Sequence, residues 1–292
     1  MQVPASAPDR PALRYHGGKY MLAPWIISHF PAHDIYTEVF GGAASVLLRK
    51  PKVYAEIYND LDDELVDYFR ILRDPRQAEE LRRLLEATPY SRTEFEQAYR
   101  RGRTKMERVR RLIVRSFQGH GSDGHNAAVK TGWRIATSKS GTSPQTDWAG
   151  FPSLIPIFSE RMLSVGIERR PALDVLRKHD GPRTLHYVDP PYMPATRSDK
   201  SRKSGEKYHA YKHEMTTEQH VELLECLLEL DGMVVLSGYS HETYDEMLAG
   251  WSRFEKAARA DGGRLRREVI WLNPAAAERR PTPCLLEALA SN

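Results

Sequence analysis

The sequence predicts an α/β protein with a parallel-type sheet that carries helices on both faces. Short β-prone runs alternate with helical patterns in the first and last parts of the chain, and turn-forming residues follow several of the strands. The length of 292 residues and the 40% hydrophobic content suffice for one large domain with an insertion.

The first part of the chain has the order strand, helix, strand, helix. A β-prone run at 35–40 meets Gly41-Gly42, after which a helical pattern continues through Leu48. A second β-prone run at 52–60 is followed by residues 61–74, whose apolar positions recur at helical spacing. The alternation stops after this helix and returns near residue 161. The later strands are expected at 161–168, 184–189 and 233–239, and the later helices at 171–180, 216–230 and 241–251.

These patterns divide the chain into a catalytic-type sheet domain and an insertion. The insertion is rich in Arg-containing helical stretches, followed by a Gly- and Ser-rich stretch. No apolar run reaches membrane-spanning length, and the N-terminus lacks the apolar centre of a signal peptide. Cys226 and Cys284 lie far apart, so neither a disulfide framework nor a metal cluster is indicated, and a cytoplasmic location is expected. The expected divisions are an arm at 1–12, a sheet domain at 13–74 and 161–274, the insertion at 75–160 and a flexible tail at 275–292.

Positive charge is concentrated in one segment. The whole chain has a formal net charge of +4, yet residues 99–139 carry eleven Lys and Arg against two acids, Glu107 and Asp123. Such a concentration favours a polyanionic partner. The alternative is a solvated helix face balanced by acids elsewhere in the fold.

A glycine pair and an acid follow the first two predicted strands. Gly41 and Gly42 let the backbone approach a ligand closely, and Asp60 comes about 20 residues later, where an acid can accept hydrogen bonds from ribose hydroxyls. NAD and FAD also fit this layout. However, the third glycine that helps to seat a pyrophosphate is missing, which favours a nucleoside ligand without phosphates, and S-adenosylmethionine is the obvious candidate.

The tetrapeptide DPPY at 189–192 ends a predicted strand. Its prolines fix φ and lack N–H groups, so the chain must leave the sheet there. An exocyclic amine of adenine or cytosine is a poor nucleophile because its lone pair is delocalised into the ring. Asp189 and the Pro190 carbonyl supply acceptors for its hydrogens, and Tyr192 offers a flat face for an extruded base. The simpler alternative is a strand end with turn residues.

Four blocks together resemble the Dam-type family of DNA adenine-N6 methyltransferases, particularly its phage and prophage branch. They are RYHGGK at 14–19, EVFGGAAS at 38–45, YNDLD at 58–62 and YVDPPY at 187–192. The resemblance extends from about residue 13 to residue 274. It implies a Rossmann-like S-adenosylmethionine-dependent methyltransferase sheet with an inserted, basic, mainly helical target-recognition domain.

The resemblance also implies roles for individual residues. The block at 14–19 supplies an aromatic residue and a lysine to the cofactor site, and the block at 38–45 supplies the glycine loop. The block at 58–62 supplies the acid that binds the ribose, and the block at 187–192 is the catalytic motif. The expected cofactor-binding residues are Tyr15, Lys19, Phe40, Gly41, Gly42, Asp60 and Asp189, and the expected catalytic residues are Asp189, Pro190 and Tyr192.

Several positions depart from the family pattern. Tyr15 stands where relatives often have tryptophan, and Ala44 where a third glycine is common. Pro171 lies near a position that is polar or acidic in many relatives, so the contact with the cofactor's adenine is not defined. Glu38 either helps at the methionine moiety or is a strand acid exposed at a sheet edge.

The insertion is the segment that serves as target-recognition domain in this family. A second basic loop at 193–214 is expected to close over the extruded base, or else to be a surface loop that is disordered without DNA. The expected DNA-binding residues are Arg108, Arg110, Arg111, Arg115, Lys130, Arg134 and Arg197.

The resulting hypothesis is a site-specific enzyme that methylates N6 of an extruded adenine in double-stranded DNA, acting as a monomer or as a weak dimer on DNA. The alternatives are an inactive DNA-binding protein of the same fold, and an N-methyltransferase acting on RNA or a protein amide.

Overall fold

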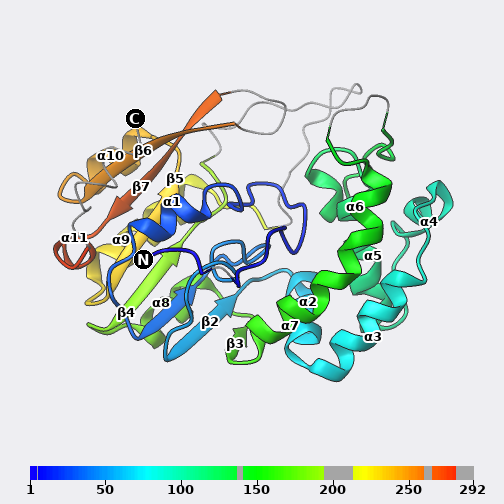
Figure 1. The fold of residues 1–292 in the computed structure, drawn as a ribbon. Helices are drawn as coiled ribbons and strands as arrows, with labels where there is room; N and C mark the ends of the chain where they lie inside the picture. Colours follow the sequence, from blue (N-terminus) through cyan, green and yellow to red (C-terminus); the bar gives the residue numbers. More distant parts are fainter. Residues whose placement is uncertain (5, 137–140, 194–212, 260–264, 281–292) are drawn as a thin grey trace.

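A seven-stranded sheet forms the centre of the molecule, with an additional group of helices beside it (Figure 1). The computed structural model describes residues 1–4, 6–136, 141–193, 213–259 and 265–280. The strand order is β3-β2-β1-β4-β5-β7-β6. The first five strands of this order are parallel, and β7 is antiparallel to both of its neighbours. The strands are β1 Ile35–Glu38, β2 Ala55–Asn59, β3 Val165–Glu168, β4 Thr184–Val188, β5 Met233–Gly238, β6 Ser252–Arg259 and β7 Leu265–Leu272.

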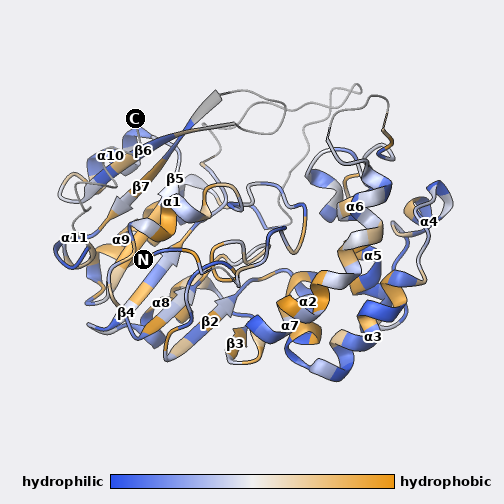
Figure 2. Ribbon diagram, viewed as in Figure 1, coloured by the Kyte–Doolittle hydropathy of each residue, from blue (hydrophilic) through white to orange (hydrophobic). Residues whose placement is uncertain are grey.

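Both faces of the sheet are buried, because successive side chains of a strand point to opposite sides. On β5, Met233 and Val235 join one core cluster, whereas Val234 and Leu236 join the other. Figure 2 shows apolar residues on the strands and on α2 and α7. The first cluster includes residues of α1 Ala23–Ser28, α2 Asp63–Arg73 and α7 Ile155–Met162, and the second those of α8 Ala172–His179, α9 Thr217–Glu229 and α10 Glu242–Met247.

The inserted helices pack against α2 and α7 at one side of the sheet (Figure 1). Their apolar residues belong to the same core cluster as the first face of the sheet, for example Leu81 of α3 and Leu112 of α5. The insertion therefore shares a continuous core with the sheet. Its elements are α3 Pro75–Glu86, α4 Arg92–Gln97, α5 Lys105–Gln118, the 3₁₀ turn η1 Asp123–His125, α6 Pro144–Gly150 and the 3₁₀ turn η2 Phe151–Leu154.

The predicted α/β class with helices on both faces is confirmed, but two features of the prediction differ from the structure. The prediction of a helix directly after the glycine pair is wrong, because residues 42–50 form turns. Within them Ala44 has φ 52°, in the left-handed region that favours glycine. The antiparallel β6–β7 pair at the sheet edge was not anticipated.

The two ends of the chain are more closely packed than expected. In the arm at 1–12, Ala12 is buried, and the Pro8 carbonyl accepts a hydrogen bond from the Tyr20 hydroxyl at 3.1 Å. The tail expected from residue 275 begins inside a helix, α11 Pro274–Glu278, in which Ala276 is buried. No helix in the described ranges is long and apolar enough to cross a membrane.

Candidate active site

A cavity lies beyond the carboxyl ends of β1 and β4, where the order of the parallel strands reverses. Ligands of open α/β sheets bind at this point because the connections diverge there and leave a crevice. The cavity is lined by parts of all four motif blocks, which the parallel strands bring to one edge. The predicted residues in its lining are Tyr15, Lys19, Phe40, Gly41, Gly42, Asp60, Asp189 and Pro190.

The glycine loop is held against the segment that follows β2. A Cβ on Gly41 would lie 2.2 Å from the Tyr58 ring, and Gly42 has φ +49°, so neither position accommodates a larger residue without strain. The Gly42 and Asp62 N–H groups each donate to one Asp60 oxygen at 2.8 Å. Burial raises the pKa of Asp60 to about 6, although these N–H groups oppose the shift. Each carboxylate oxygen retains a lone pair for a ligand.

Lys19 lies at the centre of the polar part of the cavity. Its side chain is 4% exposed, and its ammonium contacts Asp189 Oδ1 at 2.9 Å, the Tyr192 hydroxyl at 2.8 Å and Glu268 Oε1 at 3.4 Å. The Gly17 carbonyl accepts a further hydrogen bond at 3.1 Å. Burial by itself lowers the pKa of Lys19, but Asp189 and Glu268 more than offset this and the pKa is raised. Lys19 therefore remains a cation.

Asp189 follows β4 and uses one oxygen to pair with Lys19. Burial raises the pKa of Asp189 to about 6; Lys19 opposes this shift and Glu268 adds to it. The ion pair with Lys19 is made through Asp189 Oδ1. It fixes the orientation of the carboxylate at the cavity wall.

Tyr192 stacks on a second tyrosine that the sequence analysis did not select. Its ring centroid lies 4.2 Å from that of Tyr239, with an interplanar angle of 24°. Tyr239 directly follows β5, the neighbour of β4 in the sheet. The rule that ligands gather beyond strand ends was a signal that could have identified it.

Glu38, at the end of β1, is a buried cavity residue. It lies on a central strand between β2 and β4, so the interpretation as an acid exposed at a sheet edge is wrong. Its Oε2 accepts hydrogen bonds from the Tyr36 hydroxyl at 2.7 Å and the Leu47 N–H at 2.8 Å. Burial raises the pKa of Glu38 to about 8 despite these bonds.

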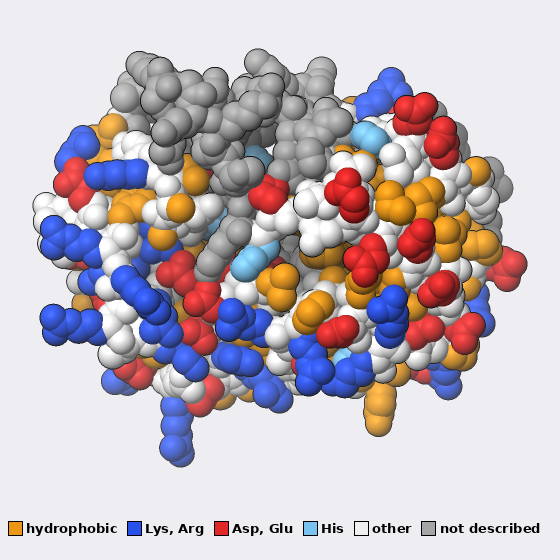
Figure 3. All heavy atoms as spheres, turned by 180° about the vertical axis from the view of Figure 1, so that it is seen from behind, with side chains coloured by type: hydrophobic (Ala, Val, Ile, Leu, Met, Phe, Trp, Pro, Cys, Tyr) orange, Lys and Arg blue, Asp and Glu red, His pale blue; other side chains and the backbone are white. Residues whose placement is uncertain are grey.

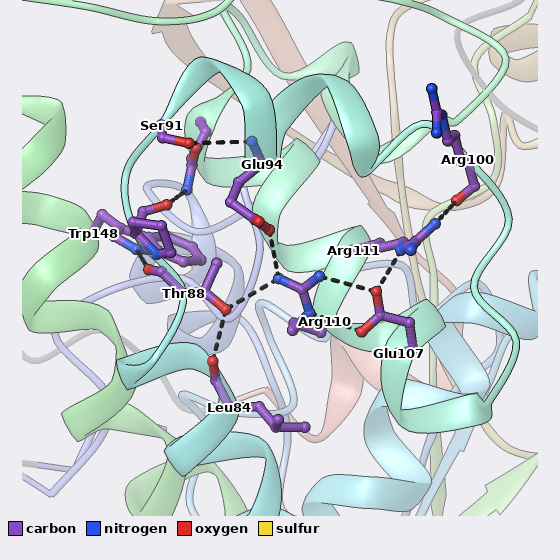
Figure 4. Close-up of polar contacts among 11 residues, drawn as sticks. Leu84, Thr88, Ser91, Glu94, Arg100, Glu107, Arg110, Arg111 and Trp148 are labelled. Carbon is purple, nitrogen blue, oxygen red and sulfur yellow. Dashed lines mark hydrogen bonds and ion pairs between the residues drawn. The ribbon is translucent and has the colours of Figure 1, made fainter.

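Arg110 and Arg111 of α5 are held by acids of the insertion itself (Figure 4). Arg110 donates to Glu107 at 2.9 Å, to Glu94 at 3.0 Å and to the Thr88 hydroxyl at 3.1 Å. Arg111 donates to Glu107 at 2.6 Å. Their side chains are only 16% and 19% exposed. A DNA phosphate would have to compete with these carboxylates.

Arg108 and Arg115 reach acids of α2. Arg108 donates to Asp67 at 3.1 Å and Arg115 to Glu64 at 2.7 Å. Arg115 is 1% exposed, and its guanidinium also donates to the Ala98 carbonyl at 2.7 Å. The structure therefore differs from the expected role of Arg115 as a DNA contact, because the buried guanidinium presents no surface to a phosphate. Arg108 and Arg115 therefore fit the alternative interpretation of the basic segment, in which acids elsewhere in the fold balance its positive charge.

Other cations of the insertion are more accessible. Lys130 is exposed, whereas Arg134 lies 3.8 Å from Asp147. Arg197, like most of the basic loop at 193–214, lies outside the described residues. Figure 3 shows Lys and Arg side chains more frequent over the inserted helices, on the left of that view, than over the sheet. Arg92, Arg100, Arg101 and Arg103 are exposed as well.

Two triple substitutions should separate these groups of arginines. Replacing Arg100, Arg101 and Arg103 with glutamine should weaken DNA binding and flatten its salt dependence by about 0.9 in log–log slope for each true phosphate contact. Replacing Arg108, Arg110 and Arg111 should instead lower thermal stability, because buried and half-buried carboxylates lose partners worth about 1–3 kcal/mol each. Salt titrations of DNA binding and thermal melts measure both. A loss of DNA affinity at unchanged stability in the second variant would show that those arginines exchange carboxylates for phosphates.

The sheet order and the cavity at its switch point are those of a Rossmann-like methyltransferase. Residues 15–131 match the family model of the D12 class N6 adenine-specific DNA methyltransferases. The match confirms the resemblance to the adenine methyltransferases over this segment, at the level of this family; the phage and prophage branch stays a prediction.

More distant comparisons add no functional information. No curated protein matches the chain. Among solved structures, it is similar to the X-ray structure of precorrin 8W decarboxylase, the product of gene MT0146 in the Methanobacterium thermoautotrophicum genome, with 10% identity and a TM-score of 0.36 over 94% of this chain and 95% of that one. A similarity at that level carries no argument about this chain.

Proposed function

We propose that the protein transfers a methyl group from S-adenosylmethionine to N6 of an adenine that is extruded from a specific site in double-stranded DNA. The observation that carries the proposal is the meeting of Asp189 and Pro190 with Lys19 and the glycine loop in one cavity. It is supported by the family match, which covers the glycine loop and the acidic motif.

The residues of the cavity fit S-adenosylmethionine. This cofactor supplies an electrophilic methyl group and carries sulfonium and ammonium charges. Opposite charges attract more strongly in a partly buried site, so an acidic lining favours it over a cofactor with a pyrophosphate. Gly41 and Gly42 provide close backbone approach, and Asp60 has oxygens available for ribose hydroxyls. The charged lining residues are Asp60, Asp62, Asp189 and Glu214 against Lys19 and Arg170, whereas Glu38, with a pKa of about 8, is mostly protonated at neutral pH.

Asp189 and the Pro190 carbonyl activate the target amine by accepting hydrogen bonds from its two N–H groups. This draws the nitrogen lone pair out of conjugation with the ring and towards the methyl carbon. Bound S-adenosylmethionine would supply the methyl carbon for the new N–C bond, and its sulfur would keep the electron pair of the C–S bond that breaks. The nitrogen then loses one proton, for which the ionised Asp189 carboxylate is the adjacent acceptor. Lys19 holds this carboxylate in place through its 2.9 Å contact.

Base extrusion follows from the position of the cavity. An adenine N6 stacked inside a duplex cannot reach a site beyond the sheet, so the base must leave the helix at a cost of a few kcal/mol. Stacking on Tyr192 can return about 1–3 kcal/mol. Because Tyr239 already stacks on this ring, the incoming base either extends the aromatic stack or displaces Tyr239.

The pH dependence of methylation should show an acidic limb near pH 6. The acceptor role needs an ionised Asp189, and its pKa is raised to about 6, so the active form is lost as the pH falls through that value. The kcat/KM for DNA should drop about tenfold per unit below it. The profile should be measured at saturating S-adenosylmethionine, because Asp60 also has a pKa of about 6 and its protonation affects cofactor binding. A flat profile between pH 5 and 7 would contradict this role.

Asp60→Ala should weaken cofactor binding. It removes hydrogen bonds to ribose worth about 1.5–3 kcal/mol each where the acceptor is charged, and it releases the Gly42 N–H. Isothermal titration calorimetry with S-adenosylmethionine measures the loss. Asp63→Ala in the first turn of α2 is a neighbouring control that does not line the cavity. Equal affinity of wild type and Asp60→Ala would remove Asp60 from the cofactor site.

The function itself is tested by expressing the chain in a host without adenine methylation and sequencing modified bases in its DNA. The expected result is N6-methyladenine at one short sequence. Methylation of RNA or of a protein amide with unmodified DNA would favour the alternative substrates. DNA binding without methylation of any substrate would favour an inactive protein of the same fold.

A further inference from the structure

We propose that Glu268, on β7, is a positioning residue for methyl transfer that acts through Lys19 on Asp189. The inference rests on the proposed function and adds to it a residue from the antiparallel edge of the sheet, outside all four motif blocks and outside the matched segment at 15–131. Glu268 is absent from the lining of the cavity, and its contacts are with Lys19 and Ser237.

The contacts of Glu268 connect β7 with the N-terminal segment and with the DPPY motif. Its Oε1 lies 3.4 Å from the Lys19 ammonium, which in turn lies 2.9 Å from Asp189 Oδ1. The same Oε1 accepts a hydrogen bond from the Ser237 hydroxyl at 3.0 Å. The ammonium is therefore held between two carboxylates that come from different strands, and the side chain of Glu268 is fixed from β5.

The burial of this group is difficult to explain as a contribution to stability alone. The side chains of Lys19 and Glu268 are 4% and 3% exposed, and burying charges costs several kcal/mol per ion, which pairing only partly repays. An apolar pair of similar volume is often as stable or more stable. Such buried charges next to a ligand cavity are typical of functional sites.

The second carboxylate, Glu268, weakens the effect of Lys19 on the strength of Asp189 as a hydrogen-bond acceptor. With Asp189 alone, the ammonium would form a single tight pair and draw electron density from the acceptor. Glu268 shares the ammonium and adds a negative charge near Asp189, so the Asp189 carboxylate remains a stronger acceptor for the target amine. Other charged or titratable groups that influence Lys19 or Asp189 are the phenols of Tyr192, Tyr187 and Tyr244, and the carboxyl of Glu38.

The test compares Glu268→Gln, which keeps the shape and removes the charge, with Glu268→Asp, which keeps the charge, and Ser237→Ala, which removes only the hydrogen bond. In Glu268→Gln, kcat should fall on the order of tenfold, with little change in the KM for DNA or the KM for S-adenosylmethionine. The acidic limb of kcat/KM should move down by about one pH unit, because a negative charge that raises the pKa of Asp189 is lost. In Glu268→Asp and Ser237→Ala the limb should stay near the wild-type position.

Two outcomes would overturn the proposal: an unmoved limb in Glu268→Gln, or an equal shift in Ser237→Ala. A purely structural role would lower activity and melting temperature without moving the limb. If Glu268→Gln does not fold, an NMR titration of the Asp189 carboxyl in wild type and Glu268→Met decides, because an apolar side chain of similar volume removes the charge and should lower the midpoint by about one pH unit. An unchanged midpoint in Glu268→Met would overturn the coupling. A wild type that methylates no DNA would instead refute the proposed function, while the NMR midpoints still report on the Glu268 coupling.

Discussion

Asp189→Ala is expected to abolish methyl transfer while DNA and cofactor binding remain largely intact. The substitution removes the acceptor that activates the target amine, and losses of general acid–base groups typically cost 10²–10⁴-fold in rate, about 3–5 kcal/mol. It removes no phosphate contact, because Asp189 lies at the cavity wall and its charge is negative. Single-turnover methylation measures the rate, and a DNA gel-shift titration measures binding.

The fold should survive this substitution because Lys19 keeps other partners. Glu268 Oε1 at 3.4 Å, the Tyr192 hydroxyl and the Gly17 carbonyl remain in contact with its ammonium. Glu222→Gln, on the exposed side of α9, is a suitable control for the loss of one carboxylate. Near wild-type methylation by a folded Asp189→Ala variant would refute the proposed mechanism.

The strand ends that build the site were predictable because each is marked by residues that cannot continue a strand. Gly41-Gly42 follows β1, Asn59-Asp60 ends β2, and the prolines of DPPY follow β4. In a parallel sheet these ends meet at one edge, so the cavity lining could be inferred without knowing side-chain contacts. This is why eight of the predicted residues line one cavity.

Glu268 could not be found in the same way. The β7 sequence LRREVIWL places three charged residues in succession before its apolar part, which hides the strand from any search for alternation. Glu268 is buried there only because Lys19, from the opposite end of the chain, supplies a counterion. Contacts over that sequence distance leave no local signal.

For the insertion, the sequence alone predicts more free positive charge than the fold presents. Counting residues 99–139 alone indicates a strongly basic segment, but acids of α2 and α4, outside that window, pair with Arg108, Arg110 and Arg115. Arg110 also pairs with Glu107, inside the window. A local count therefore overestimates the charge that is free to meet DNA. Exposure in the fold identifies better candidates for phosphate contacts than position on the basic helix.

Substitutions at Tyr192 should separate the contribution of its ring from that of its hydroxyl. Tyr192→Ala loses both base stacking, about 1–3 kcal/mol or roughly 5- to 150-fold in rate, and the contact with Lys19 at 2.8 Å. Tyr192→Phe keeps the flat face and loses only the contact with Lys19. Because the ammonium retains Asp189 and Glu268, the loss in Tyr192→Phe should be smaller, about 0.5–1.5 kcal/mol or a few-fold.

The order of activities should therefore be wild type, then Tyr192→Phe, then Tyr192→Ala, measured as single-turnover rates on one DNA duplex. A 2-aminopurine at the target position should brighten when wild type binds, because the base leaves its stacked neighbours. The brightening should be largest in Tyr192→Ala if the base still leaves the duplex, because no ring remains there to quench it. Tyr239→Phe is a matched control that keeps the stack on Tyr192 and leaves the Lys19 contact untouched. Equal rates for the Ala and Phe variants would show that the ring makes no contact with the base, and that the hydroxyl bound to Lys19 is the only part of Tyr192 used in catalysis.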